Sequence, residues 1–272
     1  MDPLSAAVLG LVQALTEFLP VSSSGHLVLG QALLGVDAGS GAAFEVAVHL
    51  GTLLSVLLLL RREVGVLLRA LVRLLKAPTQ VRRLVREDAD IRLGVAIVVG
   101  CLPAGILGVL FKDQLEAAFS SVRLVACALL FTGVLLLSTR FLKPGTGEVT
   151  VKRGLLIGLA QAVAILPGVS RSGSTISTAM LLKVEPEAAA RYSFLMSLPV
   201  IGGASALKAM EMLKNPPDSQ TLVALGIGGA VAFVAGLGTL RLVFAVVRRG
   251  WFSHFGWYCL ALGTVALIFA GR

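Results

Sequence analysis

Long apolar stretches recur along this 272-residue chain and constrain its fold more than any other feature. A helix needs about 20 largely apolar residues to cross the hydrocarbon core of a bilayer. Only 14% of the residues are charged and 56% are hydrophobic, whereas an ordinary soluble domain is about 25% charged. The sequence therefore predicts an all-α polytopic membrane protein, because helices satisfy their own backbone hydrogen bonds in lipid. The predicted spans are residues 43–60, 92–111, 122–140, 190–212, 220–240 and 252–270.

Basic residues outnumber acidic residues by 24 to 15, which gives a net charge of +9. In a soluble protein this excess would suggest nucleic acid as a partner. In a membrane protein it is typical of cytoplasmic loops, so we expect membrane lipids as partners and no nucleic acid. Nine basic residues lie in 61–92, which we expect to be a cytoplasmic loop that begins with an amphipathic helix on the inner leaflet. Counting spans from this loop places both chain termini on the external side.

Two further apolar segments, residues 3–36 and 154–183, are each broken at the centre by Pro, Gly and Ser. The breaks read Leu-Pro-Val-Ser-Ser-Ser-Gly at 19–25 and Leu-Pro-Gly-Val-Ser-Arg-Ser-Gly at 166–173. Such runs end one helix and start another. We therefore expect two re-entrant helix-loop-helix hairpins, and the alternative is a kinked spanning helix in each place. The start of the chain lacks the basic flank of a cleavable signal peptide, so we expect the first hairpin to stay in the mature protein.

The two broken segments form an internal repeat. With a gap-free offset of 148, 8 of the 16 residues in 10–25 are identical to those in 158–173. We therefore expect two repeats, residues 1–148 and 149–272, each with one hairpin and three spans. Because three is an odd number, the second repeat enters the membrane from the opposite side. Inverted repeats with broken helices place a ligand site near the midplane, where the two interruptions meet.

Each hairpin carries one isolated charge of opposite sign. With histidine counted as neutral, Glu17 is the only formally charged residue in 3–36, and Arg171 is the only one in 154–182. A charge inside the membrane is costly, so we expect the two to share one polar cavity. The alternative is a purely structural ion pair. His49 and His254 lie in apolar surroundings, and we interpret both as structural.

Hydroxyl and glycine residues crowd both loops at the start of a returning helix. The N-terminus of a helix offers unpaired N–H groups and a positive dipole end, which bind phosphate. Helix capping accounts for one serine per loop, whereas three or four are present. We therefore predict a phosphate site completed by the guanidinium of Arg171. The predicted substrate-binding residues are Ser22, Ser24, Gly168, Ser170, Ser172, Gly173, Ser174 and Thr175.

The polar side chains around the isolated carboxylate are the candidates for chemistry. His26 follows Ser23 by three residues, so we expect both to face one pocket, where imidazole could transfer a proton or attack phosphorus. Gln13 lies one helical turn before Glu17, and their oxygens could hold a divalent cation or orient a water. The predicted metal ligands are therefore Glu17 and Gln13. The predicted catalytic residues are Glu17, Ser23, His26 and Arg171.

Two motifs resemble the signatures of the bacterial undecaprenyl pyrophosphate phosphatase family. The first, at 13–26, reads Gln-Ala-Leu-Thr-Glu-Phe-Leu-Pro-Val-Ser-Ser-Ser-Gly-His, and its first position is Glu or Gln in the family pattern. The second, at 167–175, reads Pro-Gly-Val-Ser-Arg-Ser-Gly-Ser-Thr. Chain length, motif spacing and the order of apolar segments extend the resemblance over essentially the whole chain.

The resemblance implies a phosphatase of the bacterial inner (plasma) membrane. The family converts the C55 polyprenyl diphosphate carrier to the monophosphate, which recycles the carrier for cell-wall synthesis and is associated with bacitracin resistance. It requires a divalent cation, commonly Mg²⁺ or Ca²⁺. The resemblance also implies that Glu17, His26 and Arg171 are essential. Its supporting residues are Ser23, Ser170, Ser172 and Thr175.

Several alternatives stay open from the residues alone. The nucleophile is Ser23, His26 or an activated water. A flippase or transporter of the inverted-repeat type would use the same architecture, and a non-catalytic receptor would leave the intramembrane charges unexplained. We expect the site to open to the external side and to bind a polyprenyl diphosphate as the substrate. A homodimer is one candidate assembly.

Overall fold

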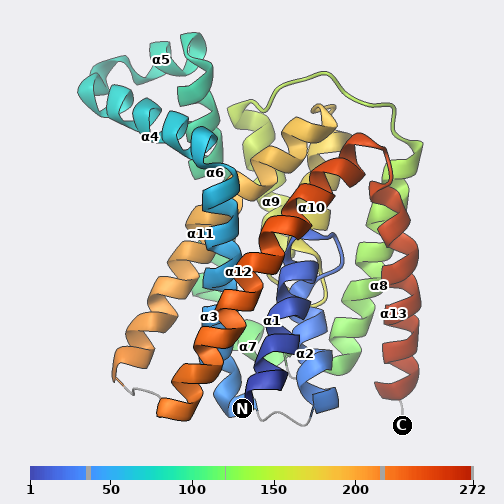
Figure 1. The fold of residues 1–272 in the computed structure, drawn as a ribbon. Helices are drawn as coiled ribbons and strands as arrows, with labels where there is room; N and C mark the ends of the chain where they lie inside the picture. Colours follow the sequence, from blue (N-terminus) through green and yellow to red (C-terminus); the bar gives the residue numbers. More distant parts are fainter. Residues whose placement is uncertain (35–37, 120, 215–217, 271–272) are drawn as a thin grey trace.

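The computed structural model describes residues 1–34, 38–119, 121–214 and 218–270 (Figure 1). Within these ranges the chain forms α-helices and short 3₁₀ turns without a β-strand, which confirms the all-α fold class. The 3₁₀ turns are Pro78–Gln80, Thr139–Phe141 and Phe252–His254. The helices are α1 (Pro3–Phe18), α2 (Ser23–Leu34), α3 (Ala38–Leu59), α4 (Arg61–Lys76), α5 (Val81–Glu87), α6 (Ala89–Leu110), α7 (Lys112–Phe119), α8 (Val122–Ser138), α9 (Val151–Val163), α10 (Arg171–Leu181), α11 (Pro186–Lys214), α12 (Ser219–Arg248) and α13 (Phe255–Ala270).

The six predicted spans are all helical, as α3, α6, α8, α11, α12 and α13. In the described part of the chain, four helical stretches are long and apolar enough to cross a membrane, and a fifth qualifies if α3 and α4 count as one bent pair. Helix α11 is long enough but more polar, because it carries buried serines at 193, 197 and 205. The four stretches are Ala89–Leu110, Val122–Phe141, Ser219–Arg248 and Phe252–Phe269.

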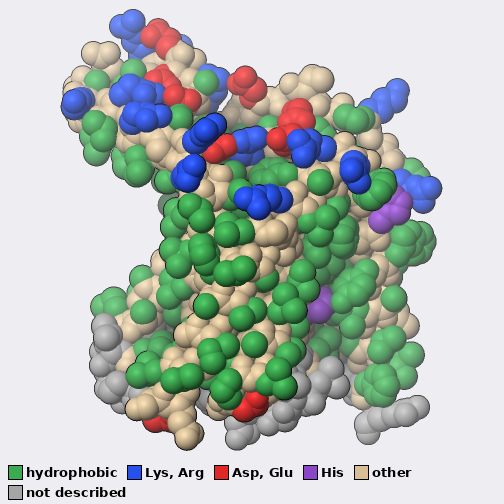
Figure 2. Space-filling model, viewed as in Figure 1, with side chains coloured by type: hydrophobic (Ala, Val, Ile, Leu, Met, Phe, Trp, Pro, Cys, Tyr) green, Lys and Arg blue, Asp and Glu red, His purple; other side chains and the backbone are tan. Residues whose placement is uncertain are grey.

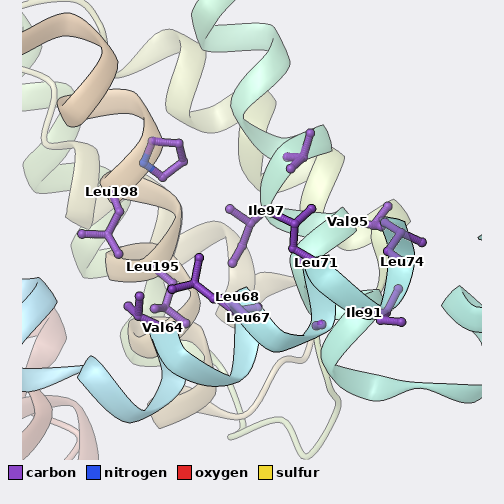
Figure 3. A pocket seen from close by; sticks show the side chains of 14 residues that line it. Val64, Leu67, Leu68, Leu71, Leu74, Ile91, Val95, Ile97, Leu195 and Leu198 are labelled. Atoms are coloured by element: carbon purple, nitrogen blue, oxygen red, sulfur yellow. The ribbon is translucent and has the colours of Figure 1, made fainter. Parts of the chain in front are cut away.

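Helix α4 turns away from α3 by 82° and lies at the end of the molecule where Lys and Arg side chains gather (Figures 1 and 2). Its arginines alternate with leucines, as expected for a helix on a membrane surface. With α6 and α11 it encloses an apolar groove, whose side chains are shown in Figure 3. The groove lining includes Leu67, Leu71, Ile97 and Leu195 and offers no side chain that could bind a phosphate.

The helices of the two hairpins are too short to cross the bilayer. Helix α1 has 16 residues and α10 has 11, which correspond to about 24 and 17 Å against a core of roughly 30 Å. Helix α1 enters from the end where α13 finishes, whereas α9 enters from the basic end (Figure 1). The two hairpins therefore point toward one another from opposite ends, as the inverted repeat requires.

The packing of the helices repeats between the two halves of the chain. Helix α1 packs along α12 and α9 packs along α6, while α8 packs on α13 and α3 on α11. Glycines allow the close approach of the first two pairs: a Cβ on Gly10 would lie 2.5 Å from the carbonyl oxygen of Gly228, and one on Gly158 would lie 2.2 Å from that of Gly100. Small residues commonly let membrane helices approach in this way. The repeat boundary at 148–149 stays a prediction.

A glycine crossing of this kind predicts a specific loss of stability. We expect Gly158→Ala to lower the free energy of unfolding by roughly 1–3 kcal/mol, because the added methyl meets backbone that cannot move independently. Gly105→Ala on α6 is the matched control, since nothing lies within 4 Å of its Cβ position. Thermal unfolding in detergent compares the two variants, and equal melting temperatures would contradict the crossing.

Candidate active site

Each hairpin turns in a serine-rich loop that caps the returning helix. Ser170 Oγ accepts a hydrogen bond from the backbone N–H of Gly173 at 3.0 Å, and Ser22 Oγ accepts one from Gly25 at 3.4 Å. These four residues are related by the 148-residue offset. One serine in each loop is therefore a helix cap, and the remaining hydroxyls are available for other contacts.

The second loop is held by a neighbouring span. Thr132 of α8 donates to the carbonyl oxygen of Gly168 at 3.1 Å and accepts from the N–H of Ser170 at 3.1 Å. Gly168 has φ +93°, and a Cβ there would lie 2.4 Å from the carbonyl oxygen of Val125. Only glycine fits this position. In the first loop, Ser22 adopts φ +69°, which is uncommon for a residue with a side chain.

The isolated acid and the isolated cation meet between the hairpins. Arg171 Nη2 lies 2.6 Å from Glu17 Oε1, and the exposed fractions of the two side chains are 13% and 5%. Glu17 comes from the end of α1 and Arg171 is the first residue of α10. The predicted juxtaposition of the two charges is therefore present as a direct, buried ion pair.

The second carboxylate oxygen of Glu17 gathers the remaining polar groups. Glu17 Oε2 accepts hydrogen bonds from Ser23 Oγ at 2.7 Å and from Gln13 Nε2 at 3.0 Å. His49 Nε2 lies 3.7 Å from the same oxygen. His49 was interpreted from the sequence as structural; α3 packs against α1 and brings its imidazole to the carboxylate and to the wall of the site.

A polar cavity adjoins the ion pair. It contains about 690 Å³ of empty space, part of which is open to solvent. Helices α2 and α10 both begin at its wall, where their first residues, Ser23 and Arg171, are exposed to the cavity. Two helix N-termini and a guanidinium make this wall favourable for an anion. The polar lining residues are Thr16, Glu17, Ser22, Ser23, Ser24, His49, Gln161, Ser170 and Arg171.

The cavity continues toward the end of the molecule that lies opposite the basic face. A second hollow shares His49, Val200 and Ile201 with it and is also lined by Glu45 and Ser205. Along α3 and α11, these additional residues lie nearer the end where α1 begins and α13 finishes (Figure 1). The route out of the cavity therefore leads away from the Lys and Arg side chains of Figure 2.

Part of the predicted substrate-binding set lies behind the cavity wall. Ser172 Oγ donates to the carbonyl oxygen of Leu19, and Thr175 Oγ1 contacts Ser193 Oγ at 2.6 Å. These contacts join α10 to α1 and α11. Of all the predicted site residues, those that the structure does not bring to the cavity wall are Gln13, His26, Gly168, Ser172, Gly173, Ser174 and Thr175.

His26 does not share the cavity with Ser23, contrary to expectation. Its Nδ1 contacts the carbonyl oxygen of Ser22 at 2.8 Å, and its Nε2 contacts the hydroxyl of Tyr258 at 2.7 Å. A carbonyl oxygen only accepts, so Nδ1 carries a proton; when the ring is neutral, Nε2 then accepts from the tyrosine hydroxyl. The imidazole is drawn back along α2 and toward α13, and its catalytic role stays a prediction.

The donor set partly fits a divalent cation. Among the described residues no group of three or more His, Cys, Asp or Glu side chains could hold a metal. Glu17 Oε2 and Ser23 Oγ nevertheless lie 2.7 Å apart, Gln13 contacts the same carboxylate oxygen through Nε2, and its Oε1 is buried without a hydrogen-bond partner in the described part. Mg²⁺ often binds one or two carboxylates together with substrate phosphates, and these residues fit that mode.

Sequence reasoning missed His49, Thr16 and Gln161 as lining residues. His49 and Thr16 carry no local signal, because only helix packing brings them to the wall. Gln161 did have one, since the internal repeat places it in register with Gln13.

Fold and site together define a class: all-α integral membrane proteins with a charged centre between two inverted re-entrant hairpins. A family sequence model described as bacitracin resistance protein BacA matches residues 6–265, and the chain belongs to this family. It is 45% identical to the undecaprenyl-diphosphatase of Salinibacter ruber, over 96% of this chain and 97% of that protein. It is 38% and 39% identical to proteins of the same name from Desulforapulum autotrophicum and Bacteroides fragilis, over 98% of each chain. The resemblance found in the two motifs is thereby confirmed.

Proposed function

We propose that this protein is an integral membrane phosphatase that hydrolyses undecaprenyl diphosphate to undecaprenyl phosphate and inorganic phosphate. The carrying observation is the Glu17–Arg171 pair, which sits at the wall of a cavity where two helices begin. Phosphoryl transfer depends on positioned donors that stabilise charge on the phosphoryl oxygens, and the names of the relatives supply the substrate. Recycling the lipid carrier supports cell-wall synthesis and confers bacitracin resistance.

The diphosphate occupies the cavity while the polyprenyl tail lies in lipid between the helices. Arg171 contacts Glu17 and, at 3.5 Å, the carbonyl oxygen of Ser193. These contacts use only part of its five N–H donors, so donors remain for the terminal phosphate. The N–H groups at the starts of α2 and α10 add further donors.

Glu17 and Ser23 are arranged for proton transfer, because the hydroxyl already donates to Oε2 at 2.7 Å. An oxygen nucleophile attacks the terminal phosphorus and passes its proton to Glu17. The bond from that phosphorus to the bridging oxygen breaks, and undecaprenyl phosphate leaves with the electron pair. The nucleophile is a water held beside Ser23, which releases inorganic phosphate directly, or Ser23 itself, whose phosphoserine a water then hydrolyses to free phosphate and regenerate the hydroxyl. A phosphoenzyme trapped on Ser23 would distinguish the two. His26, the third candidate, lies outside the cavity wall.

Glu17 and Gln13 would hold a divalent cation, Mg²⁺ or Ca²⁺, through their oxygens. The cation, when bound, neutralises charge on the phosphates. The protein resides in the bacterial plasma membrane with both termini outside and the cavity open to the external side. The basic end opposite the termini and the route through the second hollow support this orientation. Light scattering in detergent would test the expected homodimer.

Phosphate release from purified protein in detergent tests the proposed function. We expect release from undecaprenyl diphosphate, a fall of at least about tenfold with a chelator, and recovery when Mg²⁺ or Ca²⁺ is restored. Because nothing can be transported in detergent, absence of release with either cation would favour the flippase alternative. If a chelator leaves phosphate release unchanged, the proposed cation requirement is rejected and the proposed hydrolase activity is retained.

A further inference from the structure

Two glutamines in equivalent positions of the repeat have different surroundings. Gln13 and Gln161 are related by the 148-residue offset, and both are buried, with exposed fractions of 0% and 2%. Gln13 donates to Glu17 one helical turn later. In the second half the position of Glu17 is taken by Ile165. Gln161 therefore lacks the carboxylate partner that Gln13 has.

The amide of Gln161 is buried and unpaired. Neither its Nε2 nor its Oε1 has a hydrogen-bond partner among the described residues. Buried polar side chains are normally paired, and an unpaired amide is destabilising. Gln161 of α9 lines the same cavity as Glu17 and Arg171, and the lining residues that directly follow this helix, Ala164 and Ile165, are apolar. A ligand in the cavity would supply the missing partner.

We propose that the Gln161 side chain binds the diphosphate group of the substrate, with Nε2 donating to a non-bridging phosphate oxygen. This inference rests on the proposed function and adds a neutral donor from α9 to the charged donor from α10. A second cationic side chain at this place would compete with Arg171 for the carboxylate of Glu17, whereas a neutral amide can bind a phosphate oxygen without doing so. Gln161 is thus a substrate-binding residue that the two signature motifs do not contain.

The Gln161→Met variant tests the inference, because methionine has similar length and no hydrogen-bonding amide. We expect kcat/KM for phosphate release to fall by about 10- to 100-fold, as for loss of a hydrogen bond to a charged group. We expect the melting temperature without ligand to be equal to or above that of the wild type, since an unpaired polar group is removed. A residue with a merely structural role would lose stability, so a lower melting temperature with a proportionate loss of active protein would overturn the proposal.

Ser177→Ala is the matched control. Ser177 Oγ is also buried and unpaired among the described residues, but it does not line the cavity. We expect this variant to keep kcat/KM within about twofold of the wild-type value. Methylene diphosphonate, a non-hydrolysable probe, should raise the melting temperature of wild type and Ser177→Ala and have little effect on Gln161→Met. Unchanged kcat/KM and an unchanged probe response in Gln161→Met would overturn the proposal.

If Gln161→Met does not fold, a second variant still tests the inference. Gln161→Glu keeps the size and polarity of the side chain, and its negative charge should raise KM for the diphosphate at least about tenfold. A wild-type KM in this variant would overturn the inference. If the wild-type protein releases no phosphate, the proposed function fails, while the diphosphonate response still shows whether Gln161 binds a phosphate group.

Discussion

The Arg171→Ala variant is expected to lose phosphate release by a factor of at least about 10³. In phosphoryl transfer an arginine that stabilises the transition state contributes roughly 10³–10⁵ in kcat. Arg171→Lys should recover only part of the activity, because an ammonium cannot reproduce the planar fork of a guanidinium. Initial rates of phosphate release at saturating substrate measure the effect.

Folding must be monitored in this experiment, because Arg171→Ala leaves the carboxylate of Glu17 buried without its cation. Removing one partner of a buried pair costs about 3–5 kcal/mol. Arg241→Ala, at an exposed arginine of α12, controls for the loss of a positive charge and should keep wild-type turnover. Near-normal rates in Arg171→Ala would rule out the proposed phosphate clamp.

The second large effect distinguishes a catalytic pair from a structural ion pair. In the double variant Glu17→Gln with Arg171→Met, both charges disappear together. Replacing a buried ion pair by uncharged side chains is often neutral or stabilising, so we expect the double variant to fold with a melting temperature near that of the wild type. We nevertheless expect turnover to fall at least about 10³-fold, because both the proton acceptor and the guanidinium are lost.

Glu17→Gln alone should also be inactive, with the guanidinium left unpaired. A folded double variant that retains turnover would mean that the pair is structural, and the hydrolytic centre would then have to lie elsewhere. Size-exclusion chromatography and thermal unfolding of each variant, run beside the rate measurement, separate loss of chemistry from loss of folding.

Several parts of the fold were predictable because their causes are local. The lengths of the apolar stretches predict α6, α8 and α12, and the Pro, Gly and Ser runs predict where α1 ends and α10 begins. The meeting of Glu17 with Arg171 was also predictable, since two opposite charges in otherwise uncharged membrane segments lower each other's burial cost. The short helix α7, by contrast, lies in a stretch expected only to connect two spans.

Which residues form the site was less predictable, because this depends on which helices pack against one another. His49 reaches Glu17 only because α3 packs on α1, and Tyr258 reaches His26 only through the position of α13. Motif proximity suggested that Ser23 and His26 share a pocket, but the carbonyl of Ser22 draws the imidazole away. No periodicity within one segment could indicate these contacts.

By itself the sequence determined that the chain is a helical membrane protein with two duplicated hairpins and one isolated charge in each. These properties follow from hydrophobicity, helix-breaking residues and the cost of charge in lipid, which act within a single segment. The tertiary structure alone decided which side chains face the cavity and which lie behind it. That choice arises from close packing between segments far apart in the chain, such as the glycine crossings of α1 with α12 and of α9 with α6.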